Sequence, residues 1–180
     1  MMLLTTSRRP SDELRTFCRD LSNTISDLTR VNRGKMSLDG VAEKAIELEA
    51  DHVIVVDRWN KGVGQISLFT LRSNGLAVFA PQLLLSNILL RRDFGQPTRR
   101  KATAVTMDSK DFGELETVGK RFSEFFGLPL LTTKQAYREH NVSLHLMLDS
   151  SKRLRVTFIG LERMVELGPQ VTVSKLVWDV

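Results

Sequence analysis

Cysteine and histidine are scarce in this chain, and their scarcity limits the chemistry open to it. Cys18 is the single cysteine among 180 residues, so an intrachain disulfide and a cysteine-based zinc cluster are both excluded. The three histidines, His52, His140 and His145, share no spacing typical of metal ligands. Cys18 falls on the apolar face of an expected helix, where a thiol is usually a buried core residue. The sequence therefore predicts no metal site and no cofactor.

Long apolar runs are also missing. The most apolar stretch, "LAVFAPQLLLSNILL" from Leu76, is too short to span a bilayer and contains Pro81 and three polar residues. The start, "MMLLTTSRRP", lacks the basic leader and long apolar run of a secretory signal. With 42% hydrophobic and 26% charged residues, the 180-residue chain suits one globular domain or two small halves. We therefore expect a soluble intracellular protein without membrane contact.

Catalytic motifs are absent as well. Gly62 and Gly64 form a bare G-x-G in an expected hairpin turn, without the strand-to-helix context or the G-K-[ST] of a nucleotide site. The carboxylates show no pairing beyond helix surfaces, so no general acid or base can be assigned. The sequence therefore predicts a protein that is not an enzyme and has no small-molecule substrate.

What the chain has in excess is positive charge, and the first half carries it. Residues 1–101 contain 16 Lys and Arg against 11 Asp and Glu, a net charge of +5. Residues 102–180 contain ten of each sign and are neutral. Such an excess favours an acidic partner without selecting one.

Apolar spacing predicts an α/β fold with mixed (α+β) sheets, built from a unit that occurs twice. In the first half we expect helices capped by Ser11 and Ser37 and strands over 2–6, 28–31, 52–56, 65–71 and 76–80. In the second half we expect a helix over 115–126, a short helix over 135–139 and strands over 102–107, 130–133, 142–148, 154–159 and 170–178.

Both halves then have the order β-α-β-α-β-β-β, related by a pseudo-twofold axis. Adding 101 to the apolar positions of the first helix favours this duplication, because Leu14, Phe17, Leu21 and Ile25 map onto Leu115, Val118, Phe122 and Phe126. Identity between the halves is negligible, so a chance agreement of two amphipathic helices stays open as the alternative. On the second helix, Leu38, Val41, Ala42, Ala45 and Ile46 are expected to form one apolar face.

The run "LLLSNILL" is expected in the core, with a partner-binding segment as the alternative. The stretch "RRDFGQPTRRK" at 91–101 is expected to be an exposed hinge between a basic half, 1–101, and a neutral half, 102–180.

The polar residues after the first two strands are predicted to meet in space. If these strands lie parallel in one sheet, their strand-to-helix loops share the edge beyond the carboxyl ends of the strands. That edge would carry the side chains of Ser7, Arg8, Arg9, Arg30, Asn32, Arg33 and Lys35. Arginine forks and helix amino ends favour phosphate, and Gly34 would allow close backbone approach. A purely structural interpretation stays open, in which Ser11 caps its helix and Arg8 or Arg9 pairs with Asp12 or Glu13.

Three stretches resemble the Brix domain family, in particular its archaeal single-domain members. They are "TTSRRPS", "RVNRGKMSLDGVAEKAIELEADHVIVVDRW" and "GLAVFAPQLLLSNILLRRDFG". The resemblance runs through most of residues 3–95, is specific at "TTSRRPS" and "NRGKMSL", and beyond Lys101 rests on length and strand order. The chain lacks the long charged extensions of larger eukaryotic members, so partners bound through such tails are not expected.

The resemblance implies a single Brix domain over 1–180 and a ribosome-biogenesis factor that associates with precursor ribosomal RNA and with other assembly proteins. It implies two halves, each similar to the anticodon-binding domain of class IIa aminoacyl-tRNA synthetases. It assigns RNA contact to Arg8, Arg9, Arg33 and Lys35, and to Arg91 and Arg92. From charge alone, Arg99, Arg100 and Lys101 of the hinge join the candidate RNA-binding residues.

Two alternatives remain beside non-catalytic RNA binding. The chain could be a protein-interaction module that docks its basic half on an acidic partner, with incidental RNA contact. It could also be an enzyme on an α/β scaffold, which the missing catalytic set disfavours.

Overall fold

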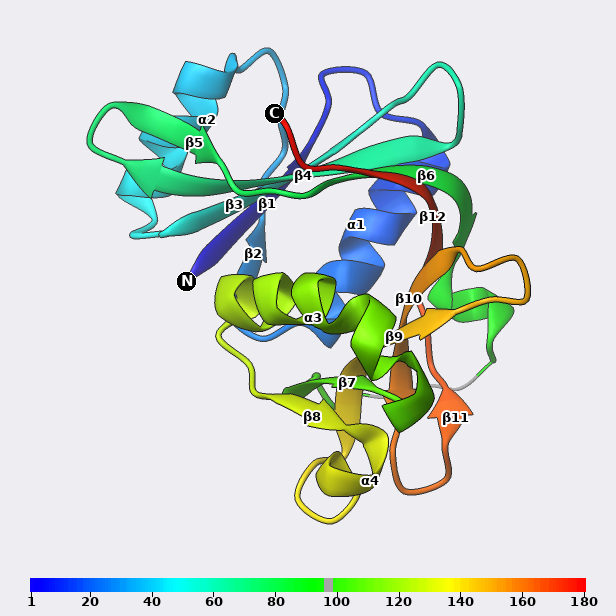
Figure 1. The fold of residues 1–180 in the computed structure, drawn as a ribbon. Coiled ribbons are helices and arrows are strands. Elements are labelled where there is room, and N and C mark those ends of the chain that lie inside the picture. The colour runs from blue at the N-terminus through cyan, green and yellow to red at the C-terminus, as the bar shows by residue number, and fades with distance from the viewer. Residues whose placement is uncertain (96–98) are drawn as a thin grey trace.

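The computed structural model describes residues 1–95 and 99–180 and has a mixed α/β fold (Figure 1). The strands of these residues form one continuous 12-stranded mixed sheet that runs through both halves. None of the described helices is long and apolar enough to cross a membrane. The elements of residues 1–95 are, in chain order, β1 (Met2–Thr6), α1 (Asp12–Thr24), β2 (Leu28–Arg30), α2 (Leu38–Glu47), β3 (His52–Asp57), β4 (Gly64–Arg72), β5 (Gly75–Val78), β6 (Gln82–Leu89) and the 3-10 helix η1 (Arg91–Asp93).

The second half repeats the strand order of the first. Its elements are β7 (Ala104–Met107), the 3-10 helix η2 (Ser109–Asp111), α3 (Phe112–Phe126), β8 (Leu130–Thr132), α4 (Thr133–Ala136), β9 (Val142–Leu148), β10 (Leu154–Gly160), β11 (Val165–Glu166) and β12 (Gln170–Val177). The sheet order is β2-β1-β3-β4-β6-β12-β10-β9-β7-β8, with β5 beside β4 and β11 beside β10. Read outward from the central antiparallel pair β6 and β12, both halves have the same arrangement.

The expected order β-α-β-α-β-β-β misses one strand in each half. The run "LLLSNILL" is strand β6, which pairs with β4 on one side and with β12 on the other. Its inward residues Leu83, Leu85 and Ile88 are buried, which explains the long apolar run. In the second half, the additional strand is the two-residue β11.

Helices pack on both faces of the sheet, because successive side chains of a strand point to opposite faces. Along β1, Leu4 belongs to a large core shared by α1 and α3, whereas its neighbour Leu3 faces a smaller core under α2. The α4 residue Ala136 packs in a third small cluster. Figure 1 shows α1 and α3 in the interior of the molecule, with α2 and α4 toward its two ends. The predicted apolar face of α2 is narrower than expected, because Leu38 and Ile46 are 46% and 63% exposed.

The predicted hinge at 91–101 can be followed only in part, since residues 96–98, with Pro97, lie outside the described residues. On its first side, Arg91 opens η1 and is half-buried. On its second side, Lys101 is exposed, and the next residue, Ala102, donates its backbone N–H to Thr24 O at the end of α1. The described ends of the hinge therefore lie against the first half.

Candidate nucleic-acid interface

Three parallel strands end at one edge of the sheet. Strand β1 pairs in parallel with β2 on one side and with β3 on the other, so Thr6, Arg30 and Asp57 close neighbouring strands in the same direction. The loop after β1 and the loop after β2 therefore lie side by side, as the parallel arrangement predicted. Hydrogen bonds join the end of β1 to the first residue after β2, with Thr5 Oγ1 donating to Val31 O at 2.8 Å and Val31 N to Leu4 O at 2.8 Å.

Arg33 connects the two loops through its guanidinium group. Its Nη1 donates to Thr6 O at 3.0 Å, and its Nε donates to Met36 O at 2.7 Å. Arg8 reaches the same Met36 carbonyl from the other loop, with a distance of 3.3 Å from its Nε. Both guanidinium groups are thereby oriented by backbone carbonyls while they keep N–H groups for a ligand.

The positive charge of this edge is not neutralised by carboxylates. We call Ser7, Arg8, Arg9, Arg30, Asn32, Arg33 and Lys35 the cationic edge; within the described residues, none of its five cations forms an ion pair with a carboxylate. Partial burial, and then the neighbouring charge of Arg8, lower the pKa of Arg33, whereas Asp57 acts in the opposite direction. Positive groups therefore crowd together here, and an anion would relieve their repulsion.

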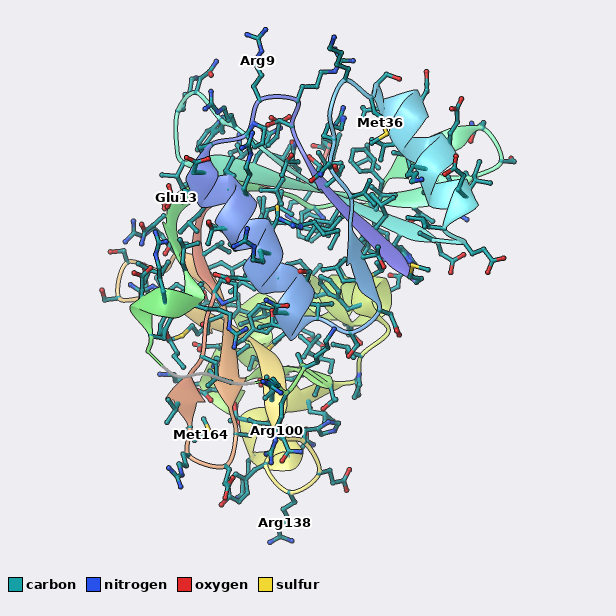
Figure 2. All side chains as sticks on the ribbon, turned by 180° about the vertical axis from the view of Figure 1, so that it is seen from behind. Arg9, Glu13, Met36, Arg100, Arg138 and Met164 are labelled. Atoms are coloured by element: carbon teal, nitrogen blue, oxygen red, sulfur yellow. The ribbon has the colours of Figure 1, made fainter. Side chains whose placement is uncertain are left out.

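Part of the cationic edge is hollow. A pocket of about 370 Å³ lies between the two loops and the first turns of α1, and we call it the arginine pocket. Its wall consists of Thr6, Ser7, Arg8, Pro10, Arg15, Cys18, Arg30, Val31, Asn32, Arg33 and Gly34. Arg9 lies outside it and extends from its loop into solvent (Figure 2).

The serines that open the two helices have structural roles. Ser11 Oγ accepts the N–H of Leu14 at 3.2 Å, and Ser37 Oγ accepts the N–H of Gly40 at 3.1 Å. They cap α1 and α2 as predicted. Asp12 lies 3.7 Å from Arg15, so the pairing that was considered for Arg8 and Arg9 is made by another arginine.

Relatives of known family share much of this sequence. Over 139 residues, the chain is 31% identical to a probable Brix domain-containing ribosomal biogenesis protein of Pyrobaculum aerophilum, an alignment that covers 76% of this chain and 74% of the relative. The chain belongs to the Brix domain family. A protein of Aeropyrum pernix with the same description is 30% identical over 112 residues, which cover 61% of this chain and 62% of that relative, less than two thirds of its length. No family model matches the chain.

Solved structures show the same Brix domain architecture. The crystal structure of a probable ribosomal biogenesis protein from Aeropyrum pernix superposes with a TM-score of 0.77 at 24% identity, covering 98% of both chains. That of Mil, an archaeal Imp4-like protein, superposes with a TM-score of 0.65 at 22% identity, covering 98% of this chain and 99% of the other. At such low identity, these two likenesses concern the fold.

The basic residues of the hinge do not join the cationic edge of this Brix domain. Arg91 donates its backbone N–H to Asp20 Oδ2 at 2.9 Å, and Lys101 Nζ lies 3.3 Å from Ile25 O, both near the end of α1 that is remote from Ser11. Arg100 Nη1 donates to Asn141 Oδ1 in the second half. Figure 2 shows Arg100 far below Arg9. Of the candidate hinge residues Arg91, Arg92, Arg99, Arg100 and Lys101, the three with the contacts above, Arg91, Arg100 and Lys101, therefore lie away from the cationic edge.

The corresponding place in the second half has mixed charge. The ends of β7 and β8 border a wider pocket of about 710 Å³, which contains Lys134 and Arg138 but also Asp108. Thr133 Oγ1 donates to Asp108 Oδ1 at 2.8 Å. Arg138 lies at the opposite end of the molecule from Arg9 (Figure 2). This pocket therefore differs from the arginine pocket, which no carboxylate lines.

Two cations near the edge were missed by sequence reasoning. Arg15 lines the arginine pocket from α1, one turn after Ser11, although it resembles an ordinary helix-surface residue in the sequence. Arg58 is exposed and follows β3, whose carboxyl end lies at the same edge. The parallel pairing of a third strand was the signal that could have found Arg58.

Cys18 and His145, the other candidate groups of the sequence, are buried in the fold. Burial raises the pKa of Cys18 to about 12, so its thiol stays protonated at neutral pH although Arg30 acts to lower it. His145 is buried and lies 2.9 Å from Thr106 Oγ1 within the sheet. The described residues contain no cluster of side chains that could hold a metal ion.

Proposed function

We propose that this Brix domain chain is a ribosome biogenesis factor that binds precursor ribosomal RNA through the cationic edge, without catalysis. The observation that carries the proposal is the meeting of five cations at one edge with no carboxylate partner within the described part of the chain. Its family supports the biological setting, because both relatives are described as probable ribosomal biogenesis proteins.

The mechanism is electrostatic capture. Arginine forks at the edge replace the counterions around RNA phosphates, and their release favours binding at low salt. The second half, which is neutral in net charge, is left for contacts with other assembly proteins. The basic residues of the hinge form a second, separate contact with the same RNA. We place this activity in the cytoplasm, as for the archaeal single-domain members that the chain resembles.

The proposal includes an origin for the architecture. The shared strand order of the two halves supports a duplicated unit with a pseudo-twofold axis through the β6 and β12 pair. Each unit would correspond to the anticodon-binding domain of class IIa aminoacyl-tRNA synthetases, a module that also contacts RNA.

A salt titration of RNA binding tests the function. The affinity of a fluorescently labelled single-stranded fragment of precursor ribosomal RNA is measured by anisotropy between about 50 and 200 mM salt. The logarithm of the affinity should fall by roughly 0.7 for each phosphate neutralised, per unit of log salt. In the Arg8→Ala/Arg9→Ala variant, this slope should become smaller by about one to two.

The second half supplies a charge-matched control. Lys134→Ala/Arg138→Ala also removes two exposed cations, but at the opposite end of the molecule, and should leave the slope unchanged. Equal slopes for the wild type and the Arg8→Ala/Arg9→Ala variant would remove these residues from the interface. If an acidic protein displaces the RNA better than heparin does, the edge is instead a protein-docking surface.

A further inference from the structure

The arginine pocket contains cations without any acidic side chain in its wall. Arg8, Arg15, Arg30 and Arg33 line it, and its remaining wall residues are neutral. The nearest ion pair, between Arg15 and Asp12, spans 3.7 Å with both side chains largely exposed, so it holds Arg15 weakly. Arg8, Arg15 and Arg30 are exposed, but together with Arg33 they surround one hollow that no carboxylate lines, which favours an anion there.

Several polar atoms of this pocket lack a protein partner. Ser7 Oγ is buried and makes no hydrogen bond. Within the described residues, no hydrogen bond or ion pair engages the Arg30 guanidinium or the Asn32 side chain. Arg8 uses only Nε and Arg33 leaves Nη2 unused, so donors from two loops and from β2 remain for a ligand. A buried hydroxyl without a partner is costly unless a ligand completes it.

The pocket is larger than a phosphate alone requires, and part of its wall is apolar. A volume of about 370 Å³ falls within the range of about 300 to 1,000 Å³ found for sites that enclose small organic molecules. Pro10 and Val31, both partly exposed, give it an apolar side beside the arginines. Arginine planes also stack on nucleobases, and proteins usually read RNA through unstacked single-stranded bases.

We propose that the arginine pocket holds one nucleotide of a single-stranded RNA, with its 5′-phosphate among the four arginines and its nucleoside against Pro10 and Val31. This inference rests on the proposed function, since it names the RNA unit that the cationic edge receives. It also divides the edge into two parts, because Arg9 and Lys35 lie outside the pocket and contact only neighbouring phosphates.

Binding of adenosine 5′-monophosphate, measured by calorimetry alongside inorganic phosphate and adenosine, tests the pocket directly. The monophosphate should bind, compete with a labelled single-stranded oligonucleotide, and bind more tightly than either of its parts. Arg15→Ala/Arg30→Ala should weaken monophosphate binding by about tenfold or more. Arg9→Ala/Lys35→Ala, which also removes two cations, should weaken the oligonucleotide and leave the monophosphate unaffected.

Ser7→Ala provides a milder variant, because it removes a buried hydroxyl that makes no hydrogen bond within the protein. It should weaken monophosphate binding without lowering the urea midpoint, so that lost binding cannot be attributed to unfolding.

The possible failures are distinguishable. If the oligonucleotide binds and the monophosphate does not, or if phosphate binds as tightly as the monophosphate, the pocket proposal is overturned and RNA binding by the edge stands. Equal losses of monophosphate binding in the two double variants would also overturn it. If no oligonucleotide binds at all, the proposed function fails, and the pocket proposal fails with it.

Discussion

At the scale of one residue, Arg33 both connects the two loops of the cationic edge and contributes to its positive charge. Its donors connect Thr6 O and Met36 O, so Arg33→Ala should lower the free energy of unfolding by about 1–3 kcal/mol. Arg9→Ala, at a fully solvated position, should change it by less than about 0.5 kcal/mol. Urea denaturation measures both changes in the free energy of unfolding.

Arg33→Lys keeps the positive charge but loses the two-pronged guanidinium group. It should therefore lose a similar free energy of unfolding, yet preserve the salt dependence of RNA binding.

The sequence predicted individual edge residues well where topology alone decided their position. Ser7, Arg8, Asn32 and Arg33 follow parallel strands, and parallel strands bring such residues together whatever the side-chain details. Which of them point into a pocket depends on side-chain orientation and on α1, which no spacing rule supplies. Arg15 was missed for that reason.

At the scale of the element, Gly127 ends α3 in the left-handed conformation, with φ of +64°. A Cβ there would touch nothing within 4 Å, so Gly127→Ala tests backbone conformation alone and should cost about 1 kcal/mol. Gly113 is the matched control, because it lies in the first turn of the same helix with equally open space and without a positive φ. Gly113→Ala should stabilise the protein by about 0.5–1 kcal/mol. Relative to the wild type, the urea midpoint should fall in Gly127→Ala and rise in Gly113→Ala. Shifts of both midpoints in the same direction would contradict this prediction.

Sequence periodicity found the capped helices and the alternating strands, but it did not identify β6. In "LLLSNILL", the partly buried Leu84 and Leu89 alternate with the buried Leu83, Leu85 and Ile88, so both faces of β6 are apolar and the letters show no clear helical or strand period. The exposed Leu38 and Ile46 of α2 illustrate the opposite error, in which apolar residues were assigned to a core that does not reach them.

At the scale of the whole molecule, His52 marks a contact between the halves. Its ring packs 4.7 Å from that of Phe125 in α3, and burial lowers its pKa, opposed by the charge of Asp51. The unfolded chain, with a histidine pKa of about 6.5, then binds more protons than the folded one. The contribution of His52 to the free energy of unfolding is therefore fully present above the unfolded-state pKa of about 6.5. The stability should fall as the pH drops from 7.5 to 5.5. Urea midpoints at both pH values should differ less in His52→Gln, and an unchanged difference would contradict this role.

Because β6 pairs with β12, each half depends on the other to pair the backbone of its last strand. A truncated polypeptide ending at the hinge would present the backbone of β6, with its apolar Leu83, Leu85 and Ile88, as a bare strand open to any second copy. Each half protects the other from self-association, so a gene encoding one of them alone would yield an aggregation-prone fragment rather than a smaller version of the domain.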